Sequence, residues 1–395
     1  MKKATQLQIK EHNRTLVLRT IYDQEPVSRT AIAKRTLLTK TTVSEVVAEL
    51  IEEGFAHEIG RGPSSGGPRP VLLGFLPEAR TLLGVDLAND EFRGSLMDLR
   101  GNMLASESIA IENSDGAAAL EKVYTLIDRL MTHRSSPLLG IGIGSPGLIN
   151  ASEGIVHNAV NLDWKDLPLA RLLEQRYQVP VYIANDTQVA AMAEYSFGDH
   201  PPIENLAVIK IGIGLSGGFI LHGKLYHGDG HGAGEIGHIV VAENGIRCRC
   251  GNTGCLETVV SSQAMINHIT AHAQQHPEYL ETLNVKQIDE IRIRHLYQAS
   301  LHGDPVIAEY MKNACHYLAI SISNLVGILN IETVVLAGML AKFFAPYLED
   351  IAAEICRRSL SSLSKNTRIM LSSLGDDIVT LGAGSLVLKN ELELV

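Results

Sequence analysis

The residues best able to carry chemistry lie within residues 234–257. This segment holds His238, Cys248, Cys250 and Cys255, which span eighteen residues and include three of the chain's five cysteines. Three thiolates and one imidazole form a complete tetrahedral ligand set for Zn²⁺, with no position left for a water molecule. A closed set of this kind is typical of a structural metal rather than a hydrolytic one. The sequence therefore predicts a structural Zn²⁺ site; the alternative is three free thiols in a surface loop.

A second candidate for chemistry is Asp186, which follows a short predicted strand, Val181–Ile183. A carboxylate at a strand end often faces the ligand crevice of an open α/β sheet. The alternative, which we favour on this residue alone, is that Asp186 caps the helix predicted over Thr187–Tyr195. Residues 206–218, LAVIKIGIGLSGG, predict a strand that runs into a glycine-rich turn, with a second strand over Phe219–Leu225. Alone, such a turn is a weak phosphate-binding signal.

A third set of polar residues lies near the N-terminus. Apolar spacing predicts helices over His12–Asp23, Arg29–Arg35 and Lys40–Glu53, and Ser28 and Thr39 are the predicted N-caps of the last two. Two helices joined by a short turn are typical of a helix-turn-helix, whose second helix reads DNA. The alternative is an ordinary three-helix unit with a solvated polar face.

The segment that follows strengthens the DNA-binding hypothesis. Two apolar runs, Phe55–Ile59 and Val71–Phe75, are able to pair as a hairpin or wing, and the loop between them places two arginines among glycines and prolines. Arginines with so little bulk around them fit a narrow minor groove; a flexible linker is the alternative reading. Short donors in the first turn of the second helix suit base edges and phosphates. The candidate DNA-binding residues are Ser28, Arg29, Thr39, Lys40, Thr41, Thr42, Ser44, Arg61 and Arg69.

Composition and charge bound the remaining possibilities. A chain of 395 residues with 45% apolar and 20% charged residues is typical of a soluble globular protein of two or three domains. No uninterrupted apolar run is long enough for a membrane span. Cys315 and Cys356 are isolated, so we expect a reducing cytoplasm rather than a disulfide framework. Residues 1–76 hold 11 Lys and Arg against 8 Asp and Glu, whereas the rest holds 23 against 36, so only the first segment favours a polyanionic partner.

The body of the chain predicts a mixed α/β fold in which strands and helices alternate. Its lone tryptophan, Trp164, lies in a polar loop, where it either packs or stacks on a ligand. The further predicted elements are strands Thr81–Leu87, Gly94–Asp98, Met103–Ile111, Leu138–Gly144, Ile331–Ala337 and Arg368–Leu371, helices Ala117–Thr132, Pro305–Leu329, Phe344–Arg358 and Leu381–Leu388, and a helical region from Glu257 to about Ala299.

Several of these stretches together resemble the ROK family of repressors, open reading frames and kinases, over essentially the whole chain. The matching motifs are GIGSPGLI, NLDW, IANDTQVAAMAE, GKLYHGDGHGAGEIGH, CRCGNTGCLE, VVLAG and LGAGS, and VSRTAIAKRTLLTKTTVS matches the winged-helix part of the family's repressor branch. The resemblance implies a two-lobed, actin-like (ribonuclease H-like) ATPase fold that binds a sugar in its cleft. The implied domains are a winged helix-turn-helix over 1–76, a smaller lobe over 77–190 plus roughly 371–395, and a larger lobe over 191–370.

The resemblance also implies roles for individual side chains. Asp186 stands where the kinases keep the base that activates a sugar hydroxyl. His238 then serves twice, with one ring nitrogen on the metal and the other facing the sugar. The implied sugar-binding residues are Asn185, Asp186, Glu235, His238 and Glu257, and the implied zinc ligands are His238, Cys248, Cys250 and Cys255.

Departures from the kinase pattern indicate what the chain does with the sugar. The kinases' Asp-x-Gly-Gly-Thr loop is replaced by Asp-Leu-Ala-Asn-Asp at residues 86–90, which loses the glycines and the threonine and adds a carboxylate. In the second glycine loop, Ile213 replaces the threonine. Phosphoryl transfer depends on such phosphate contacts, so we expect no kinase activity.

The resulting hypothesis is a sugar-responsive repressor of carbohydrate uptake or metabolism genes that binds operator DNA and a small sugar effector. The alternative is an active ATP-dependent sugar kinase with an accessory DNA-binding domain. The family suggests a homodimer or homotetramer. A phosphotransfer-system protein is a further candidate partner, for which no residue gives a specific signal, and no membrane partner is expected.

Overall fold

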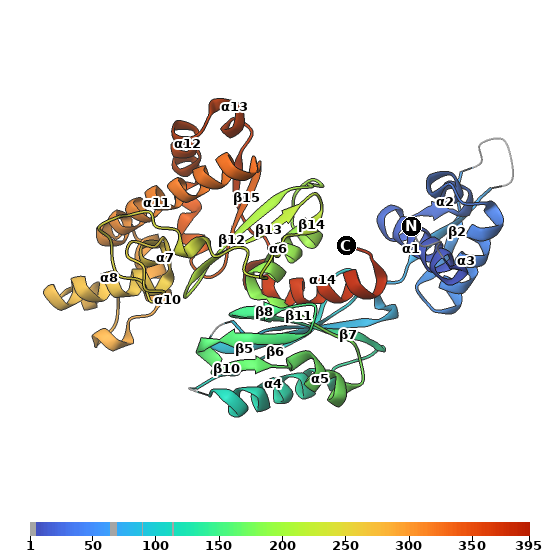
Figure 1. Ribbon diagram of the computed structural model, residues 1–395, viewed down its shortest axis with the longest axis horizontal. Helices are drawn as coiled ribbons and strands as arrows, with labels where there is room; N and C mark the ends of the chain where they lie inside the picture. The colour runs from blue at the N-terminus through green and yellow to red at the C-terminus, as the bar shows by residue number, and fades with distance from the viewer. Residues whose placement is uncertain (1–4, 64–68, 89, 113) are drawn as a thin grey trace.

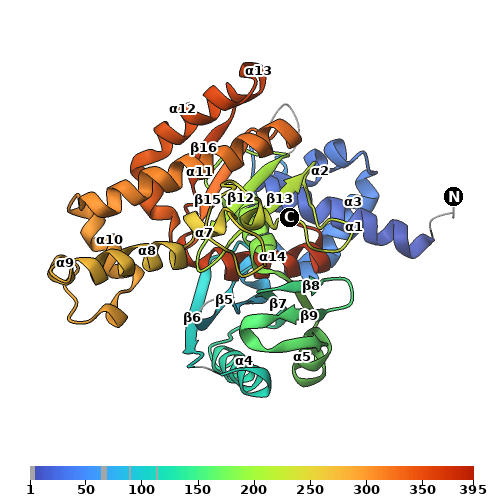
Figure 2. The same ribbon diagram turned by 60° about the vertical axis from the view of Figure 1, so that its left-hand side comes forward.

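The computed structural model describes residues 5–63, 69–88, 90–112 and 114–395 (Figure 1). Two parts of the sequence predictions, the wing residues Ser64–Pro68 and Asn89, therefore lie outside the described residues. The N-terminal domain stands at one end of the molecule, beside two lobes that are each built on a five-stranded sheet (Figures 1 and 2). Among the described helices, none is both long and apolar enough to cross a membrane.

The N-terminal domain is a winged helix-turn-helix, as predicted. Apolar side chains from its three helices, among them Leu18, Ile32 and Val47, are fully buried against Leu73 of the wing. Its first helix begins six residues earlier than the apolar spacing predicts, because Thr5 and the residue three positions on form a capping box. The elements are α1 (Gln6–Gln24), β1 (Val27–Ser28), α2 (Arg29–Thr36), α3 (Lys40–Glu52), β2 (Ala56–Arg61) and β3 (Val71–Phe75).

The first lobe is a sheet of order β11-β7-β4-β5-β6. Strands β4, β5 and β6 pair antiparallel in sequence order, and β7 and β11 extend the sheet in parallel. A small antiparallel sheet, β8-β9-β10, leads back to β11. The elements are β4 (Thr81–Asp86), β5 (Glu91–Met97), β6 (Met103–Ala110), α4 (Gly116–Met131), β7 (Leu138–Ser145), β8 (Leu148–Asn150), β9 (Ile155–Ala159), β10 (Trp164–Leu167), α5 (Leu169–Tyr177) and β11 (Val181–Asn185).

The second lobe repeats this strand order, β14-β13-β12-β15-β16, with three antiparallel strands followed by two parallel ones. Two sheets of the same order are the frame of the expected two-lobed, actin-like fold. The elements are β12 (Leu206–Ile211), β13 (Leu215–Leu221), β14 (Lys224–Leu225), α7 (Glu257–Val260), α8 (Ser262–Gln275), α9 (Tyr279–Thr282), α10 (Ile293–Leu301), α11 (Pro305–Leu329), β15 (Thr333–Ala337), α12 (Leu348–Arg358), α13 (Ser361–Ser364) and β16 (Arg368–Leu371).

Two helices, α6 (Asp186–Phe197) and α14 (Ile378–Leu392), lie side by side between the sheets (Figures 1 and 2). A Cβ added to Gly382 of α14 would lie 1.8 Å from the Val189 carbonyl oxygen of α6, so only glycine permits this approach. On its other side, α6 packs on β13, where a Cβ on Gly218 would lie 2.4 Å from the Thr187 carbonyl oxygen. The predicted domain border at residue 190 falls inside α6, which packs against both lobes.

Other predicted element bounds also differ from the observed ones. The second strand of the glycine hairpin starts at Leu215 rather than Phe219, because the turn closes earlier, with the Gly212 amide donating to the Gly214 carbonyl (2.9 Å). The helix expected from Phe344 starts at Leu348, after a 3-10 helix that holds Pro346, whose ring nitrogen has no proton to donate. The helical region after Glu257 is several short helices, of which α8 is the longest.

Candidate functional site

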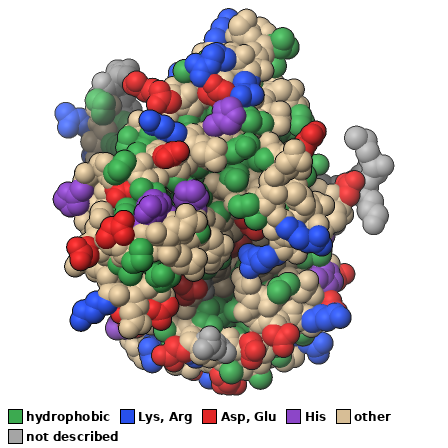
Figure 3. Space-filling model, turned by 90° about the vertical axis from the view of Figure 1, so that its left-hand side faces the viewer, with side chains coloured by type: hydrophobic (Ala, Val, Ile, Leu, Met, Phe, Trp, Pro, Cys, Tyr) green, Lys and Arg blue, Asp and Glu red, His purple; other side chains and the backbone are tan. Residues whose placement is uncertain are grey.

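Polar side chains from both lobes line a cavity of about 560 Å³ between them. Seen from the side of α8, the surface is hollowed between the lobes (Figure 3). All five residues to which the sequence assigns sugar binding lie on its walls. The residues that line the cavity include Ala88, Gly147, Asn158, Asn161, Asn185, Asp186, Lys210, Ile213, Ser216, Glu235, His238, Arg249 and Glu257.

Asn185 lies at the junction of β11 and α6, and it is this residue that caps α6. Its Oδ1 atom accepts hydrogen bonds from the Thr187 and Gln188 amides (2.9 and 3.4 Å). Its Nδ2 atom donates to the Gly147 carbonyl (3.1 Å), which fixes the turn after β7. The prediction that Asp186 caps this helix is therefore wrong, because Asn185 already satisfies the first amides.

Asp186, as the first residue of α6, forms a buried ion pair with Lys210 of β12. The Nζ atom of Lys210 lies 2.5 Å from Oδ2 of Asp186. Burial lowers the pKa of Lys210 and the carboxylates of Asp186 and Asp86 raise it, with a net upward shift. Sequence reasoning missed Lys210, although a lysine inside the apolar run LAVIKI was a signal for a buried charge with a partner.

Asp86 ends β4 beside this ion pair and is almost fully buried. Its Oδ1 atom accepts a hydrogen bond from the Ala88 amide (2.8 Å). Burial raises the pKa of Asp86 to about 6, against the opposing effect of Lys210. Two carboxylates therefore share one ammonium at the floor of the cavity, and a further anion there meets net negative charge.

Glu257, at the start of α7, fixes the glycine hairpin of the second lobe. Its Oε2 atom accepts a hydrogen bond from the Leu215 amide (3.1 Å). A Cβ on Gly214 would lie 2.7 Å from the same oxygen, so the carboxylate closely fits the turn. The other oxygen of Glu257 lies 3.9 Å from Nη2 of Arg249, a cavity residue that sequence reasoning did not single out.

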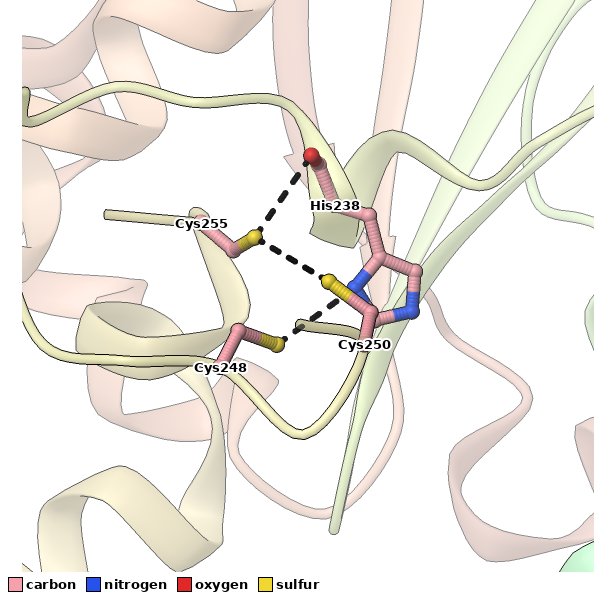
Figure 4. Close-up of side chains that lie close together, drawn as sticks. All are labelled: His238, Cys248, Cys250 and Cys255. Carbon is pink, nitrogen blue, oxygen red and sulfur yellow. Dashed lines mark hydrogen bonds between the residues drawn. The ribbon is translucent and has the colours of Figure 1, made fainter. Parts of the chain in front are cut away.

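His238 stands between the cavity and the cysteine cluster (Figure 4). Its Nδ1 atom lies 3.7 Å from the Cys248 sulfur, and its Nε2 atom lies 3.7 Å from a carboxylate oxygen of Glu235. One ring nitrogen thus faces the thiols and the other faces a cavity-lining carboxylate. This is the arrangement that a residue with two roles requires.

The cluster itself could hold a metal ion. One ligand atom each from His238, Cys248, Cys250 and Cys255 lies within 4.8 Å of the other three. The sulfurs of Cys250 and Cys255 are 3.6 Å apart, and Cys255 is fully buried (Figure 4). Burial, together with the neighbouring thiols of Cys250 and Cys248, raises the pKa of Cys255 to about 12. A soft divalent cation fits this donor set, because it stabilises the thiolates that burial alone disfavours.

In the N-terminal domain, the candidate DNA-binding residues divide into two groups. Some stabilise the domain itself: Ser28 and Thr39 cap α2 and α3, and Arg29 pairs with Glu58 (3.0 Å). Thr42 is half-buried and shares a hydrogen bond with Thr39 (2.9 Å). The second group is exposed and consists of Lys40, Thr41 and Ser44 at the start of α3, with Arg61 and Arg69 of the wing.

Trp164 packs rather than facing a ligand. It is buried among the apolar side chains of the first lobe, and its Nε1 atom donates to the Gly116 carbonyl (2.8 Å). Asn158 and Asn161, from the same polar region of the sequence, do line the cavity. The short-range sequence pattern does not distinguish these orientations, which depend on the pairing of β9 with β10.

The matches to known proteins cover nearly all of this architecture. Residues 82–390 match the ROK family, and residues 10–57 match the MarR family. The chain belongs to the ROK family. It is 34% identical to the xylose repressor of Caldicellulosiruptor bescii over 97% of both chains.

Solved structures of ROK proteins have the same fold. The crystal structure of a ROK family transcriptional regulator, a homologue of the E. coli MLC protein, matches with a TM-score of 0.84 at 28% identity and covers 98% of both chains. A ROK family glucokinase from Streptomyces griseus, in complex with glucose and AMPPNP, matches with a TM-score of 0.70 at 25% identity. That match covers 78% of this chain and 98% of the glucokinase.

Proposed function

We propose that this ROK protein is a sugar-responsive transcriptional repressor that binds operator DNA through its winged helix-turn-helix. The main observation behind the proposal is that one chain contains both a winged helix-turn-helix and a two-lobed domain with a polar cavity. A relative named for xylose repression and a solved ROK regulator both match over nearly the full length of the chain. In this proposal the small sugar is the effector, and the protein acts in the cytoplasm as a homodimer or homotetramer.

We assign the sugar to the cavity between the lobes. Carboxylate and amide groups that converge on one cavity suit the hydroxyls of a sugar. Glu235, His238 and Glu257 supply one wall, and Asn185 and Asp186 supply the other. Asn185 retains one amide proton beyond its bond to Gly147, and Asp186 retains an oxygen that does not contact Lys210. This wall therefore keeps hydrogen-bonding capacity for a ligand.

We assign Zn²⁺ to His238, Cys248, Cys250 and Cys255. The ion would supply no catalytic chemistry, because four protein ligands close its coordination shell. Its effect would be mechanical, since it ties the loop before α7 to the imidazole that faces Glu235. The chain's own residues would then hold the second wall of the sugar cavity in one arrangement.

We further propose that the chain is not a kinase. Asp186 is placed in the cavity where a base would act, and a glucokinase is among the structural matches, so ATP-dependent sugar phosphorylation is the second candidate. Against it, the Oδ2 atom of Asp186 is already engaged by the Lys210 ammonium, 2.5 Å away. Ile213 and Ala88 line the cavity where phosphate would need hydrogen-bond donors from side chains.

A DNA titration combined with a sugar panel tests this function. A labelled duplex of highest affinity, selected from a random pool, is titrated with protein with and without D-xylose, D-glucose or N-acetylglucosamine. We expect sequence-specific binding that at least one sugar changes, and a loss of about tenfold for Lys40→Ala. Lys286→Ala, an exposed lysine on the second lobe, is the charge-matched control. Equal affinity for all sequences at moderate salt contradicts the proposal, and sugar-dependent ATP turnover lost in Asp186→Asn supports the kinase instead.

A further inference from the structure

Helix α6 physically connects the cavity to the turn between β5 and β6. Its first residue, Asp186, lines the cavity, and its last residue, Phe197, lies against Gly101 in that turn. A Cβ added to Gly101 would lie 3.0 Å from two atoms of the Phe197 ring, and Gly101 has a φ of 79°. Both the space and the backbone therefore require glycine at this contact. A displacement of α6 toward the turn would therefore press Phe197 against it.

The turn is stiff enough to pass on such a displacement. The buried carboxylate of Asp98 accepts hydrogen bonds from the Arg100 amide (2.8 Å) and the Asn102 amide (2.9 Å) through one oxygen. Its other oxygen accepts from the Asn102 side chain (2.9 Å). Three hydrogen bonds to one buried carboxylate hold residues 98–102 as a unit.

Arg100 projects from this turn onto the DNA-binding domain. Its guanidinium carbon lies 4.0 Å from the ring centre of Tyr22 and 5.3 Å from that of Phe75. The same group donates to the Tyr22 carbonyl (2.6 Å) and to Glu25 (2.7 Å). Glu25 in turn accepts from the Phe75 amide (2.5 Å), so Arg100 holds the end of α1 and the end of the wing together. Cation–π and charge-assisted bonds at one residue make a directional contact.

We propose that α6, the residue 98–102 turn and Arg100 transmit the state of the sugar cavity to the DNA-binding domain. The inference rests on the proposed function and adds the residues that perform the regulation. Asp186 and Asn185 sense the ligand, Phe197 delivers the displacement, and Arg100 orients the domain through Tyr22 and Glu25. A sugar that binds one arrangement of the lobes more tightly then biases one orientation of the winged helix-turn-helix.

Arg100→Ala and Phe197→Ala test this route in the full-length protein. Arg80→Ala is the matched control, because Arg80 also stacks on the DNA-binding domain, 4.8 Å over Phe55, but lies outside the turn. For each protein, the affinity for the selected duplex is measured with and without saturating D-xylose, D-glucose or N-acetylglucosamine. Sugar affinity is measured separately by calorimetry. The coupling factor is the ratio of the two DNA affinities.

We expect Phe197→Ala to bind sugar and duplex as the wild type does and Arg100→Ala to bind sugar as the wild type does, and both to show a coupling factor within about twofold of one. Arg80→Ala should keep the wild-type factor. Arg100→Lys retains the charge and loses the fork of donors, so it should show a reduced factor even if Arg100→Ala folds poorly. Wild-type coupling in both Arg100 variants and in Phe197→Ala overturns the route alone. A wild type that binds duplex but ignores all three sugars overturns both the route and the proposed function.

Discussion

The two five-stranded sheets share one strand order, yet they fix their cavity-facing side chains by different means. In the first lobe, hydrogen bonds within the protein do so: Asn185 caps α6 and holds the Gly147 turn. In the second lobe, His238 belongs to a cysteine cluster that could hold a metal, and Glu257 is bonded to the glycine hairpin. The two sheets determine the positions of the cavity-lining side chains. Local hydrogen bonds or metal ligation determine how rigidly those side chains are held. Disturbing one wall should therefore leave the other largely intact.

The largest expected effect on sugar binding comes from removing the metal from the second wall. We expect Cys248→Ala to lose bound zinc and to weaken sugar binding by about tenfold or more, because supporting metal-site contacts have effects of this size. Cys356→Ala is the control, since that exposed cysteine lies outside the cluster. Zinc content by elemental analysis and sugar affinity by calorimetry are the measurements. Unchanged sugar affinity in a zinc-free protein would show that zinc is not needed to hold the sugar-binding residues of the second wall in position.

The ion pair between Asp186 and Lys210 joins the two walls. Removing one of the two charges should lower the stability of the folded protein. We expect Asp186→Asn to lower the free energy of unfolding of the lobes by about 3 kcal/mol, because the Lys210 ammonium loses its hydrogen-bonded carboxylate and keeps only Asp86 as a counter-charge. Urea titration measures this loss. The double variant Asp186→Asn with Lys210→Met should recover most of the stability at pH 5, where Asp86 is protonated and needs no cation beside it, but not the sugar binding. If the double variant is as unstable as the single one, the cost comes from the helix start and not from the charge.

Asp86 gives the first wall a pH dependence. Burial raises its pKa from the ordinary value of 3.8 to about 6, so between these values the folded state keeps a proton that the unfolded state has released. The contribution of Asp86 to the free energy of unfolding therefore falls as pH rises from about 4 to 6, and it stays constant at higher pH. We expect Asp86→Asn to gain about 3 kcal/mol relative to the wild type between pH 4 and pH 7. Asp90 is an exposed carboxylate in the same turn. The free energy of unfolding of Asp90→Asn should therefore depend on pH in the same way as that of the wild type.

The smallest expected effect tests the hydrogen bonds that fix the first wall. Asn185→Ala should cost about 1 kcal/mol, because the first amides of α6 lose their cap. Asn185→Ser keeps a capping oxygen and should recover most of that loss. Thermal unfolding at constant pH measures both variants. Equal losses in the two variants would assign the stabilisation to the bond with Gly147 and not to the cap.

Local features of the fold were predictable from the sequence. Ser28 and Thr39 cap their helices as expected, and the bounds of α11 and β16 match the predicted ones. The cluster of His238 with three cysteines was predictable because its members lie within eighteen residues. In each case the determining interactions lie close in sequence, where spacing and capping rules apply.

Contacts between distant segments were not predictable in this way. Lys210 read only as a residue of an apolar strand, because its partner Asp186 is brought to it by the packing of α6 on β12. Arg100 meets Glu25 across 75 residues, and no local pattern marks that contact. Asp186 was favoured as a helix cap because both it and Asn185 are good capping residues; the backbone of β11 decides between them. Tertiary packing, which a single sequence states only indirectly, determined each of these positions.

The central claim is that sugar in the cavity and DNA on the N-terminal domain are thermodynamically coupled. The most direct measurement is calorimetric titration of the full-length protein with D-xylose, D-glucose and N-acetylglucosamine, each in the presence and absence of saturating selected duplex. Reciprocity requires duplex to change sugar affinity by the same factor by which sugar changes duplex affinity. We expect one sugar to show equal factors of about fivefold or more in both directions. Specific duplex binding with identical sugar affinities in its presence and absence would contradict the account.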